Sequence, residues 1–402
     1  MRPLAKILTF LLIALGLLSP CGCTKDDSVG LYDPDESTAP APTITGISPA
    51  GSAFAGMDTI VIQGTNFSPV LGNNSVFFNA QPAALLSVSP SQITLKAPLV
   101  TMDSVGVRVS VMGALEFSNT YQYRLNAGAR PFGALIATEL AASLATDATA
   151  NLYAAYCATG RDAGILRLTP AGSQSTYAPA TSGVAIWTGL KMGPAGYLYA
   201  ARNVRAVYRF TPGGGSAATA WTASFPGGTF ILDIDFDRTG NLWCCGSAGN
   251  IYRVDPSRVI TTYAFTGNLR AVRIYNDYLY FAAKTGAGEK IWRAPITGGT
   301  LGTPEVYFDF GTAYPGKTPL AITLSSDGVL YIGIDGPEGL VIVNQDKSSS
   351  APYAAYQSLF STGIGFLAWG NADDLYASAV SGALLKFTIR GKTSAPYFGS
   401  TL

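Results

Sequence analysis

A short motif recurs six times in the C-terminal part of the chain, and this repeat limits the possible folds more than any other feature. Each copy is a leucine followed by Tyr or Trp, at Leu152, Leu198, Leu242, Leu279, Leu330 and Leu375. The spacings between successive leucines are 46, 44, 37, 51 and 45 residues. A period of about 40–50 residues with four strands per unit is typical of β-propeller blades. The repeat therefore predicts an all-β fold with a six-bladed propeller over residues 126–402.

The innermost strand of each expected blade shows a period-2 pattern of apolar side chains. An aliphatic residue stands seven or eight positions before each leucine, and a mostly apolar residue follows two positions later. Successive side chains of a strand point to opposite faces, so we expect the residue between these two to face the central channel. In three consecutive repeats this residue is charged: Lys191, Asp235 and Arg273. Asp233 lies on the same face of its strand as Asp235.

Two interpretations of these four channel residues remain open, because charges on an inner strand are costly unless they pair or meet water. In the first, Lys191, Asp235 and Arg273 form an ion network that plugs the channel and fixes the packing of the blades. In the second, the channel is a polar ligand site. Lys191 and Arg273 would then recognise a carboxylate, sulfate or phosphate, beside Asp233 and Asp235.

The turn at 237–241, just before the third leucine, resembles the turns of NHL-type and related six-bladed propellers. Propellers host unrelated chemistries, so the resemblance implies the fold and not the function. Gluconolactonase-type propellers hold a divalent metal in the channel with carboxylates and Asn. Here Asp233 and Asp235 are the only neighbouring acids on the inner strands, and two nearby cations would repel a metal. We therefore expect no metal and no other cofactor.

The loop rim is the second place where a ligand site is expected. In such propellers the loops that enter the inner strands share one face with the loops that follow the leucine strands. Aromatic faces beside polar groups suit sugar rings. The candidates on this rim are Trp187, Arg161, Arg202, Arg205, Arg270 and Lys284. The alternative is that Trp187 packs between blades and that the loop charges are merely solvated.

Residues 42–125 are expected to form a separate small β-sandwich. Short alternating runs at 59–63, 75–78, 92–97, 105–111 and 120–123 are separated by Gly, Asn and Pro turns. The segments 42–49 and 56–67, and the later Ala97-Pro98 pair, resemble an IPT/TIG domain. The resemblance implies an immunoglobulin-like module, which commonly serves as a spacer or binding platform.

The N-terminal segment predicts export. Arg2 and Lys6 precede a 12-residue apolar run, which is too short to span a bilayer and is typical of a signal peptide over residues 1–22. Gly22-Cys23 resembles a bacterial lipobox, so Cys23 is the expected lipidation site, with Cys21 as the less favourable choice. Residues 23–41 form an acidic, Pro-containing tether, and its 24–27 segment resembles the surface-export signal of Bacteroidetes lipoproteins. We expect an outer-membrane lipoprotein that faces the cell exterior; the alternative is an ordinary secretory signal followed by a free thiol.

Composition excludes several functions. The chain has no histidine, so it supplies no Ser-His-Asp triad and no His-ligated zinc site. The net charge of +1 gives no reason to expect nucleic acid. The remaining cysteines, Cys157, Cys244 and Cys245, are odd in number and are expected to be buried small hydrophobes.

Three functions stay open on the sequence. The favoured one is a non-enzymatic surface lipoprotein that binds an extracellular glycan through its propeller, with the sandwich as a spacer. A protein-interaction or adhesion module is the alternative. The third is a hydrolase or lyase that uses carboxylates or an oxygen-ligated metal, although the sequence shows no convincing catalytic constellation.

Overall fold

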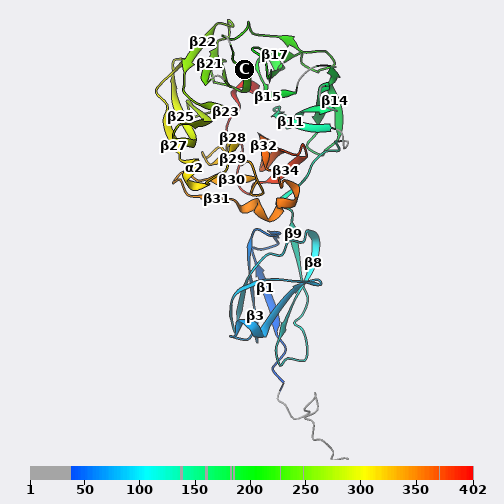
Figure 1. Ribbon diagram of the computed structural model, residues 1–402. Coiled ribbons are helices and arrows are strands. Elements are labelled where there is room, and N and C mark those ends of the chain that lie inside the picture. Colours follow the sequence, from blue (N-terminus) through cyan, green and yellow to red (C-terminus); the bar gives the residue numbers. More distant parts are fainter. Residues whose placement is uncertain are drawn as a thin grey trace, which may run out of the picture.

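The computed structural model describes residues 38–401, apart from 136–138, 159–161, 182, 184, 185, 227, 248 and 371. Within this part of the chain, a two-sheet sandwich is followed by a ring of six antiparallel sheets (Figure 1). The all-β prediction, with an immunoglobulin-like sandwich and a six-bladed propeller, is confirmed. The expected signal peptide, the lipidated Cys23 and the rim residue Arg161 lie outside the described residues.

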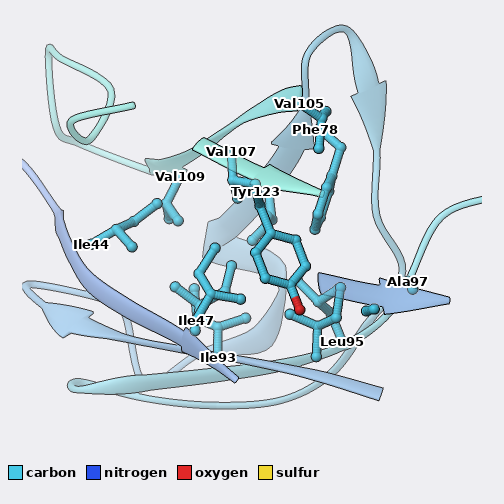
Figure 2. Close-up of a cluster of buried hydrophobic side chains, with 14 of the residues drawn as sticks. Ile44, Ile47, Phe78, Ile93, Leu95, Ala97, Val105, Val107, Val109 and Tyr123 are labelled. Atoms are coloured by element: carbon cyan, nitrogen blue, oxygen red, sulfur yellow. The ribbon is translucent and has the colours of Figure 1, made fainter. Parts of the chain in front are cut away.

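The sandwich buries one face of each of its two sheets. One sheet has the order β1 (Thr43–Ser48), β3 (Thr59–Thr65), β7 (Gln92–Lys96) and β6 (Leu85–Ser89); the other has β2 (Ser52–Phe54), β9 (Tyr121–Asn126), β8 (Met102–Val111), β4 (Asn74–Phe78) and β5 (Gln81–Pro82), with the 3-10 turn η1 (Leu71–Asn73) before β4. Alternate residues such as Ile60, Ile62, Val105 and Val107 are fully buried. Figure 2 shows such side chains from both sheets meeting in one core. The alternation of buried and exposed residues along each strand therefore gives each sheet one apolar face, and the two faces form the core of the domain.

Each propeller blade is an antiparallel sheet whose first strand lines the channel. Blade 1 has β11 (Glu139–Thr146), β12 (Leu152–Ala158), β13 (Asp162–Leu168) and β14 (Gln174–Thr181); blade 2 has β15 (Trp187–Met192), β16 (Leu198–Arg202), β17 (Val207–Phe210) and β18 (Thr219–Ala220), with η2 (Pro194–Gly196); blade 3 has β19 (Ile231–Phe236), β20 (Leu242–Gly246), β21 (Asn250–Val254) and β22 (Ile260–Ala264). Blade 4 has β23 (Asn268–Tyr275), β24 (Tyr278–Thr285), β25 (Gly288–Thr297), β26 (Thr300–Leu301) and β27 (Glu305–Phe308), then α2 (Phe310–Ala313); blade 5 has β28 (Pro319–Leu324), β29 (Leu330–Ile334), β30 (Leu340–Val343) and β31 (Ser349–Ser350), then η3 (Pro352–Leu359).

Blade 6 closes the ring with strands from both ends of the propeller sequence. Its strands are β32 (Ile364–Trp369), β33 (Asp374–Ala379), β34 (Leu384–Thr388) and, at the outer edge, β10 (Ala129–Pro131). Ala129 pairs with Phe387, so the segment that leaves the sandwich supplies the outer strand of the last blade. This pairing ties the two ends of the ring together and removes the exposed outer edge of β34.

The repeated turn before the leucine strand has a clear physical cause in blades 1 and 3. In blade 3 the carboxylate of Asp237 accepts hydrogen bonds from the backbone N–H of Thr239 (2.9 Å) and Asn241 (3.0 Å) and from Trp243 Nε1 (2.8 Å). In blade 1 Asp147 accepts the corresponding bonds from Thr149, Asn151 and Tyr153. One buried or half-buried carboxylate thus satisfies the turn's backbone donors, which explains why the motif carries Asp, Thr and Asn at fixed offsets.

The two domains meet through a polar and aromatic joint. The hydroxyl of Tyr356, on η3, donates to the Ala55 carbonyl of the sandwich (2.8 Å) and accepts from the backbone N–H of Gly128 (2.7 Å). Arg390 forms an ion pair with Asp58 (3.3 Å). The sandwich therefore sits at the outer edge of the ring, beside blades 5 and 6 (Figure 1). In the described part of the chain, none of the helices has the length and apolar character needed to cross a membrane.

Candidate functional site

The four channel candidates come together on the channel wall, in two layers. In the first layer, Arg273 Nη1 lies 3.3 Å from Asp233 Oδ2 and 2.7 Å from the Val272 carbonyl. Its Nη2 lies 3.3 Å from the carbonyl of Leu367 on the inner strand of blade 6. The guanidinium therefore bridges the channel from blade 4 to blade 6, with only 6% of the residue exposed.

The second layer pairs Lys191 with Asp235, and the C-terminal segment covers it. Lys191 Nζ lies 3.7 Å from Asp235 Oδ1 and 4.4 Å from the centre of the Tyr397 ring. Tyr397 belongs to a segment that pairs with the end of β28 through an Ala395 N–H bond to the Leu324 carbonyl (3.1 Å) and ends in η4 (Phe398–Thr401). Figure 1 shows this segment, in red, crossing the ring. One end of the channel is therefore closed by the chain itself.

The two channel carboxylates also join neighbouring blades. Asp233 Oδ2 accepts from the backbone N–H of Val272 (3.0 Å), and Asp235 Oδ2 accepts from that of Ile274 (2.9 Å). An innermost strand is a sheet edge whose outward N–H groups lack a strand partner, and buried donors without partners are costly. The acids on blade 3 therefore satisfy donors on the edge of blade 4. Burial raises the pKa of Asp233, although Arg273 and Lys191 oppose that rise.

The channel has little free space. The cavity beside Lys191, Asp235 and Tyr397 holds about 10 Å³, and the one beside Asp233 and Arg273 about 20 Å³. Such volumes are near the lower limit for one water molecule and are far too small for a sugar ring. Among the described residues, no group of three or more His, Cys, Asp or Glu side chains is arranged to hold a metal ion. The described channel is thus filled by its own ion pairs.

The rim candidates do not converge on one site. Of the two alternatives for Trp187, the structure shows the packed one: the residue is 4% exposed, and its ring lies 5.3 Å from that of Phe210. Arg202 packs beside it and donates to the hydroxyl of Tyr208 (2.8 Å). Trp187 starts an inner strand with its ring turned into the core shared by blades 1 and 2, so it offers no exposed aromatic face.

The remaining rim residues are dispersed. Arg270 forms a bidentate pair with Glu289, with both oxygens at 2.8 Å, and the two side chains are largely buried. Arg205 and Lys284 are exposed on blades 2 and 4. Arg270 lies at the point where its inner strand shifts register, and the other five inner strands have a register shift at the matching place. This repeated bulge was not foreseen from the sequence, and it sets which side chains reach the channel.

A different concave surface carries the aromatic and polar groups that the rim lacks. It lies between blades 4 and 5 and encloses about 330 Å³. We call it the tyrosine groove; its main side chains are Tyr275, Tyr278, Tyr280, Tyr307, Arg293 and Lys347. Unlike the channel cavities, it has the volume to hold a sugar residue.

Strand register places these side chains on one face of blade 4. Tyr275 pairs with Tyr278 across a two-residue turn, Tyr280 pairs with Arg293, and Arg293 pairs with Glu305. Cross-strand neighbours share a face, and period 2 adds Tyr307 to it. The turn residues Asn276 and Asp277 have φ values of 46° and 58°, which Asn and Asp tolerate better than most residues.

The tyrosines form a connected aromatic cluster. Tyr280, which is 4% exposed, lies at the floor, with its ring centre 5.0 Å from that of Tyr307, 6.3 Å from that of Tyr275 and 6.4 Å from that of Tyr278. The other three rings are half-buried and form the walls. In the sequence, Tyr280 stood out only as the aromatic residue that follows the repeat leucine Leu279. The missed signal was the short turn flanked by tyrosines at alternate positions.

Two cations complete the groove. Arg293 lies 4.8 Å from the Tyr278 ring centre and bonds through Nε to Glu305 (2.6 Å). From blade 5, Lys347 places its ammonium 3.0 Å from the centre of the Tyr307 ring. The pKa of Lys347 is lowered, first by burial of the ammonium and then by repulsion from Arg293, while Glu305 opposes this change. Aromatic faces beside such donors are suited to sugar rings and their polar substituents.

A second open groove, of about 420 Å³, lies at the joint between the domains. Phe54 and Asn126 line it from the sandwich, and Asp373 and Arg390 line it from blade 6. Arg390 stacks on the Phe54 ring (4.4 Å) and pairs with Asp58. Its charge therefore holds the two domains together and already has a partner within the chain.

Comparison with known proteins identifies the first domain. Residues 42–124 match the IPT/TIG domain family. The sandwich is an IPT/TIG domain. Human fibrocystin-L is 30% identical over 74 residues, which are 18% of this chain and 2% of fibrocystin-L. The chain therefore spans a very small part of the curated relative that it matches.

Solved structures resemble the fold of nearly the whole chain at low sequence identity. A putative phosphatase from Bacteroides thetaiotaomicron has a TM-score of 0.56 at 11% identity, over 90% of this chain and 98% of that one. An auxiliary nutrient binding protein from the same organism has a TM-score of 0.51 at 11% identity, over 88% and 98%. A luciferin-regenerating enzyme has a TM-score of 0.53 at 14% identity, over 65% and 95%. These likenesses establish the architecture, and their varied descriptions fit a fold that hosts unrelated functions.

Proposed function

We propose that this protein is a non-enzymatic surface lipoprotein that captures an extracellular glycan in the tyrosine groove, with the IPT/TIG domain as a spacer. The observation that carries the proposal is the groove itself: a 330 Å³ concavity with four tyrosines and two cations. The likeness to an auxiliary nutrient binding protein of similar architecture supports a binding function. Lipidation at Cys23 would hold the protein at the outer membrane, and the IPT/TIG domain would hold the propeller away from the bilayer.

Binding is favoured over catalysis because the carboxylates of the channel are already engaged. Asp233 and Asp235 each accept a backbone hydrogen bond from blade 4 and each face a cation. A general acid or base must reach a substrate proton, and these groups lie in cavities near the size of one water molecule.

A glycan panel tests this function. The chain from residue 24, without lipid, is run in affinity electrophoresis against neutral and acidic soluble polysaccharides. We expect retardation by at least one polysaccharide, and at least a tenfold loss of affinity in Tyr278→Ala, because a sugar-stacking ring is removed. Tyr121→Ala, the same change on a half-buried tyrosine of the sandwich, is the matched control. Retardation that survives Tyr278→Ala would place the glycan site elsewhere, and no retardation by any polysaccharide would refute glycan capture.

A protein partner is the second candidate function, and apolar side chains on the IPT/TIG domain favour it. Met112 is 70% exposed, Leu115 77% and Val70 56%. Exposed apolar side chains of this size are typical of interaction surfaces when they gather in one region. A pull-down from outer membranes with wild-type protein and with Met112→Ser, Leu115→Ser tests this candidate; equal capture by both would argue against it.

A further inference from the structure

We infer that the tyrosine groove selects an acidic glycan, and that Lys347 and Arg293 contact the carboxylate or sulfate group of a sugar whose ring packs on the tyrosines. This inference rests on the proposed function and adds the chemical class of the ligand. Blade 4 supplies the stacking tyrosines and Arg293, and blade 5 supplies Lys347.

The charges around the groove favour an anionic ligand. Two cations line the groove, and its lining contains no carboxylate. Glu305 of β27 lies on the same face as Arg293 and forms an ion pair with it, which offsets much of the Arg293 charge. Asp277, which adjoins the lining residues Asn276 and Tyr278, is held by Arg238 at 2.9 Å. The excess positive charge of the lining is therefore that of Lys347.

The second argument is the state of Lys347. Among the described residues its ammonium rests on a tyrosine ring and forms no ion pair, although Glu305 attracts it from a greater distance. Other lysines of the propeller pair with acids: Lys191 with Asp235, Lys290 with Asp309 and Lys317 with Glu338. Lys284 also forms no ion pair among the described residues, but it is exposed to solvent, whereas Lys347 is held against Tyr307. The lowered pKa of Lys347 reflects burial and repulsion from Arg293, and a bound anion would offset both. An ammonium held over an aromatic wall, at the mouth of a concavity, is thus positioned to meet an anion from outside the chain.

The third argument is geometry. Both cations lie against Tyr307: the Arg293 guanidinium carbon is 5.3 Å from its ring centre and the Lys347 ammonium is 3.0 Å from it. The two charges therefore converge on one wall of the groove. Tyr275, on the other wall, packs against Gly328, where an added Cβ would lie 3.1 Å from the tyrosine hydroxyl. A sugar lying between these walls would direct an acidic substituent toward the cations.

Matched pairs of polysaccharides test the inference. The probes are polygalacturonate with its carboxyl-reduced neutral form, and dextran sulfate with dextran. Affinity electrophoresis and calorimetry are run on wild type, Lys347→Gln, Arg293→Gln, Tyr278→Ala and the control Lys96→Gln. Lys96 is an exposed lysine on strand β7 of the sandwich, and its loss removes the same charge without touching the groove.

The expected result is that at least one acidic probe binds at least tenfold more tightly than its neutral partner. Lys347→Gln should lower affinity for that probe about tenfold, because a charge-assisted hydrogen bond is lost, while Lys96→Gln changes it less than twofold. The polygalacturonate and dextran sulfate arms distinguish a carboxylate from a sulfate. Affinity for the acidic probe should fall as salt rises.

Other outcomes separate this inference from the proposed function. If neutral polysaccharides bind in a Tyr278-dependent manner as tightly as acidic ones, glycan capture stands and acidic selection is overturned. If acidic probes bind equally to wild type, Lys347→Gln and Tyr278→Ala, the interaction is nonspecific and both are overturned at this groove. If no polysaccharide binds, the function fails and the inference falls with it.

Discussion

The propeller holds two sets of charged residues, one in the central channel and one in the tyrosine groove, and the two sets differ in how their charges are paired. In the channel every charge meets an opposite charge, and each carboxylate also holds a backbone N–H of the next blade. In the groove the ammonium of Lys347 rests on a tyrosine ring beside open space. Buried charges that face an opposite charge serve packing, whereas a charge left over an aromatic wall is available to a ligand.

The largest loss of stability is expected for a substitution in the channel. Asp235→Ala leaves the buried Lys191 ammonium without its carboxylate and the Ile274 N–H without its acceptor, so unfolding free energy should fall by about 3–5 kcal/mol. Urea unfolding measures it, with Asp103→Ala, whose side chain is 96% exposed, as the control. A second substitution, Lys191→Met, should restore part of the loss. A loss below about 1 kcal/mol would break the claim that the channel charges serve packing.

The converse prediction concerns the groove. Tyr278→Ala should reduce glycan affinity at least tenfold, since a stacking face is lost, while unfolding free energy falls by about 1 kcal/mol, as is usual for a half-buried side chain. Affinity electrophoresis and urea unfolding on the same preparation separate the two effects. A large loss of stability with no change in binding would mean that the groove tyrosines serve packing, as the channel charges do.

A pH measurement tests the blade turns, where carboxylates also serve structure. Burial raises the pKa of Asp147, but hydrogen bonds from Asn151, Thr149 and Tyr153 outweigh burial and lower it overall. An acid with a lowered folded pKa stabilises the protein above its unfolded pKa of about 4 and loses that contribution as pH falls through the folded value. The unfolding free energy of wild type should exceed that of Asp147→Asn by about 1–2 kcal/mol at pH 7. The gap should close below about pH 4. A gap that stays constant down to pH 2 would contradict this role.

The smallest effect is expected at a backbone position in the same turn. Ala150 has a φ of 61°, and the matching residue in blade 3 is Gly240, with a φ of 83°. Ala150→Gly removes a steric penalty of about 1 kcal/mol, partly offset by the greater entropy of glycine in the unfolded chain. Thermal unfolding should show a slightly raised Tm with unchanged glycan binding. A lowered Tm would mean that the lost burial of the Ala150 methyl group and the entropy of glycine outweigh the relieved strain.

Several features of the fold were predictable because they repeat. The leucine period and the aliphatic positions before it identified the inner strands, and Leu190, Ile234, Val272 and Ile322 are indeed buried between blades. The IPT/TIG domain was recognisable from its turn and strand segments, which the family match confirms. The channel-facing phase of Lys191, Asp235 and Arg273 followed from period 2, which acts locally along a strand.

Other features depend on contacts between residues far apart in the chain, and the sequence held no local sign of them. The pairing of Ala129 with Phe387, the packing of Tyr397 over Lys191 and the turn of Trp187 into the core between blades 1 and 2 are of this kind. Tyr278 and Lys347 come from different blades, so their groove exists only when blades 4 and 5 pack together.

The sequence by itself determined the architecture, because the period of the strands, the residues of the turns and the length of the repeat are local properties that can be read within each blade. Only the tertiary structure decided which charged side chains form ion pairs between blades and which remain without an ion pair beside a groove. That outcome depends on whether an opposite charge, a backbone donor or an aromatic ring from another blade arrives within hydrogen-bond or stacking distance. Asp and Lys both usually lie at protein surfaces. Only their neighbours in space make Asp235 a joint between blades and leave Lys347 on an aromatic wall, where we propose that it contacts a ligand.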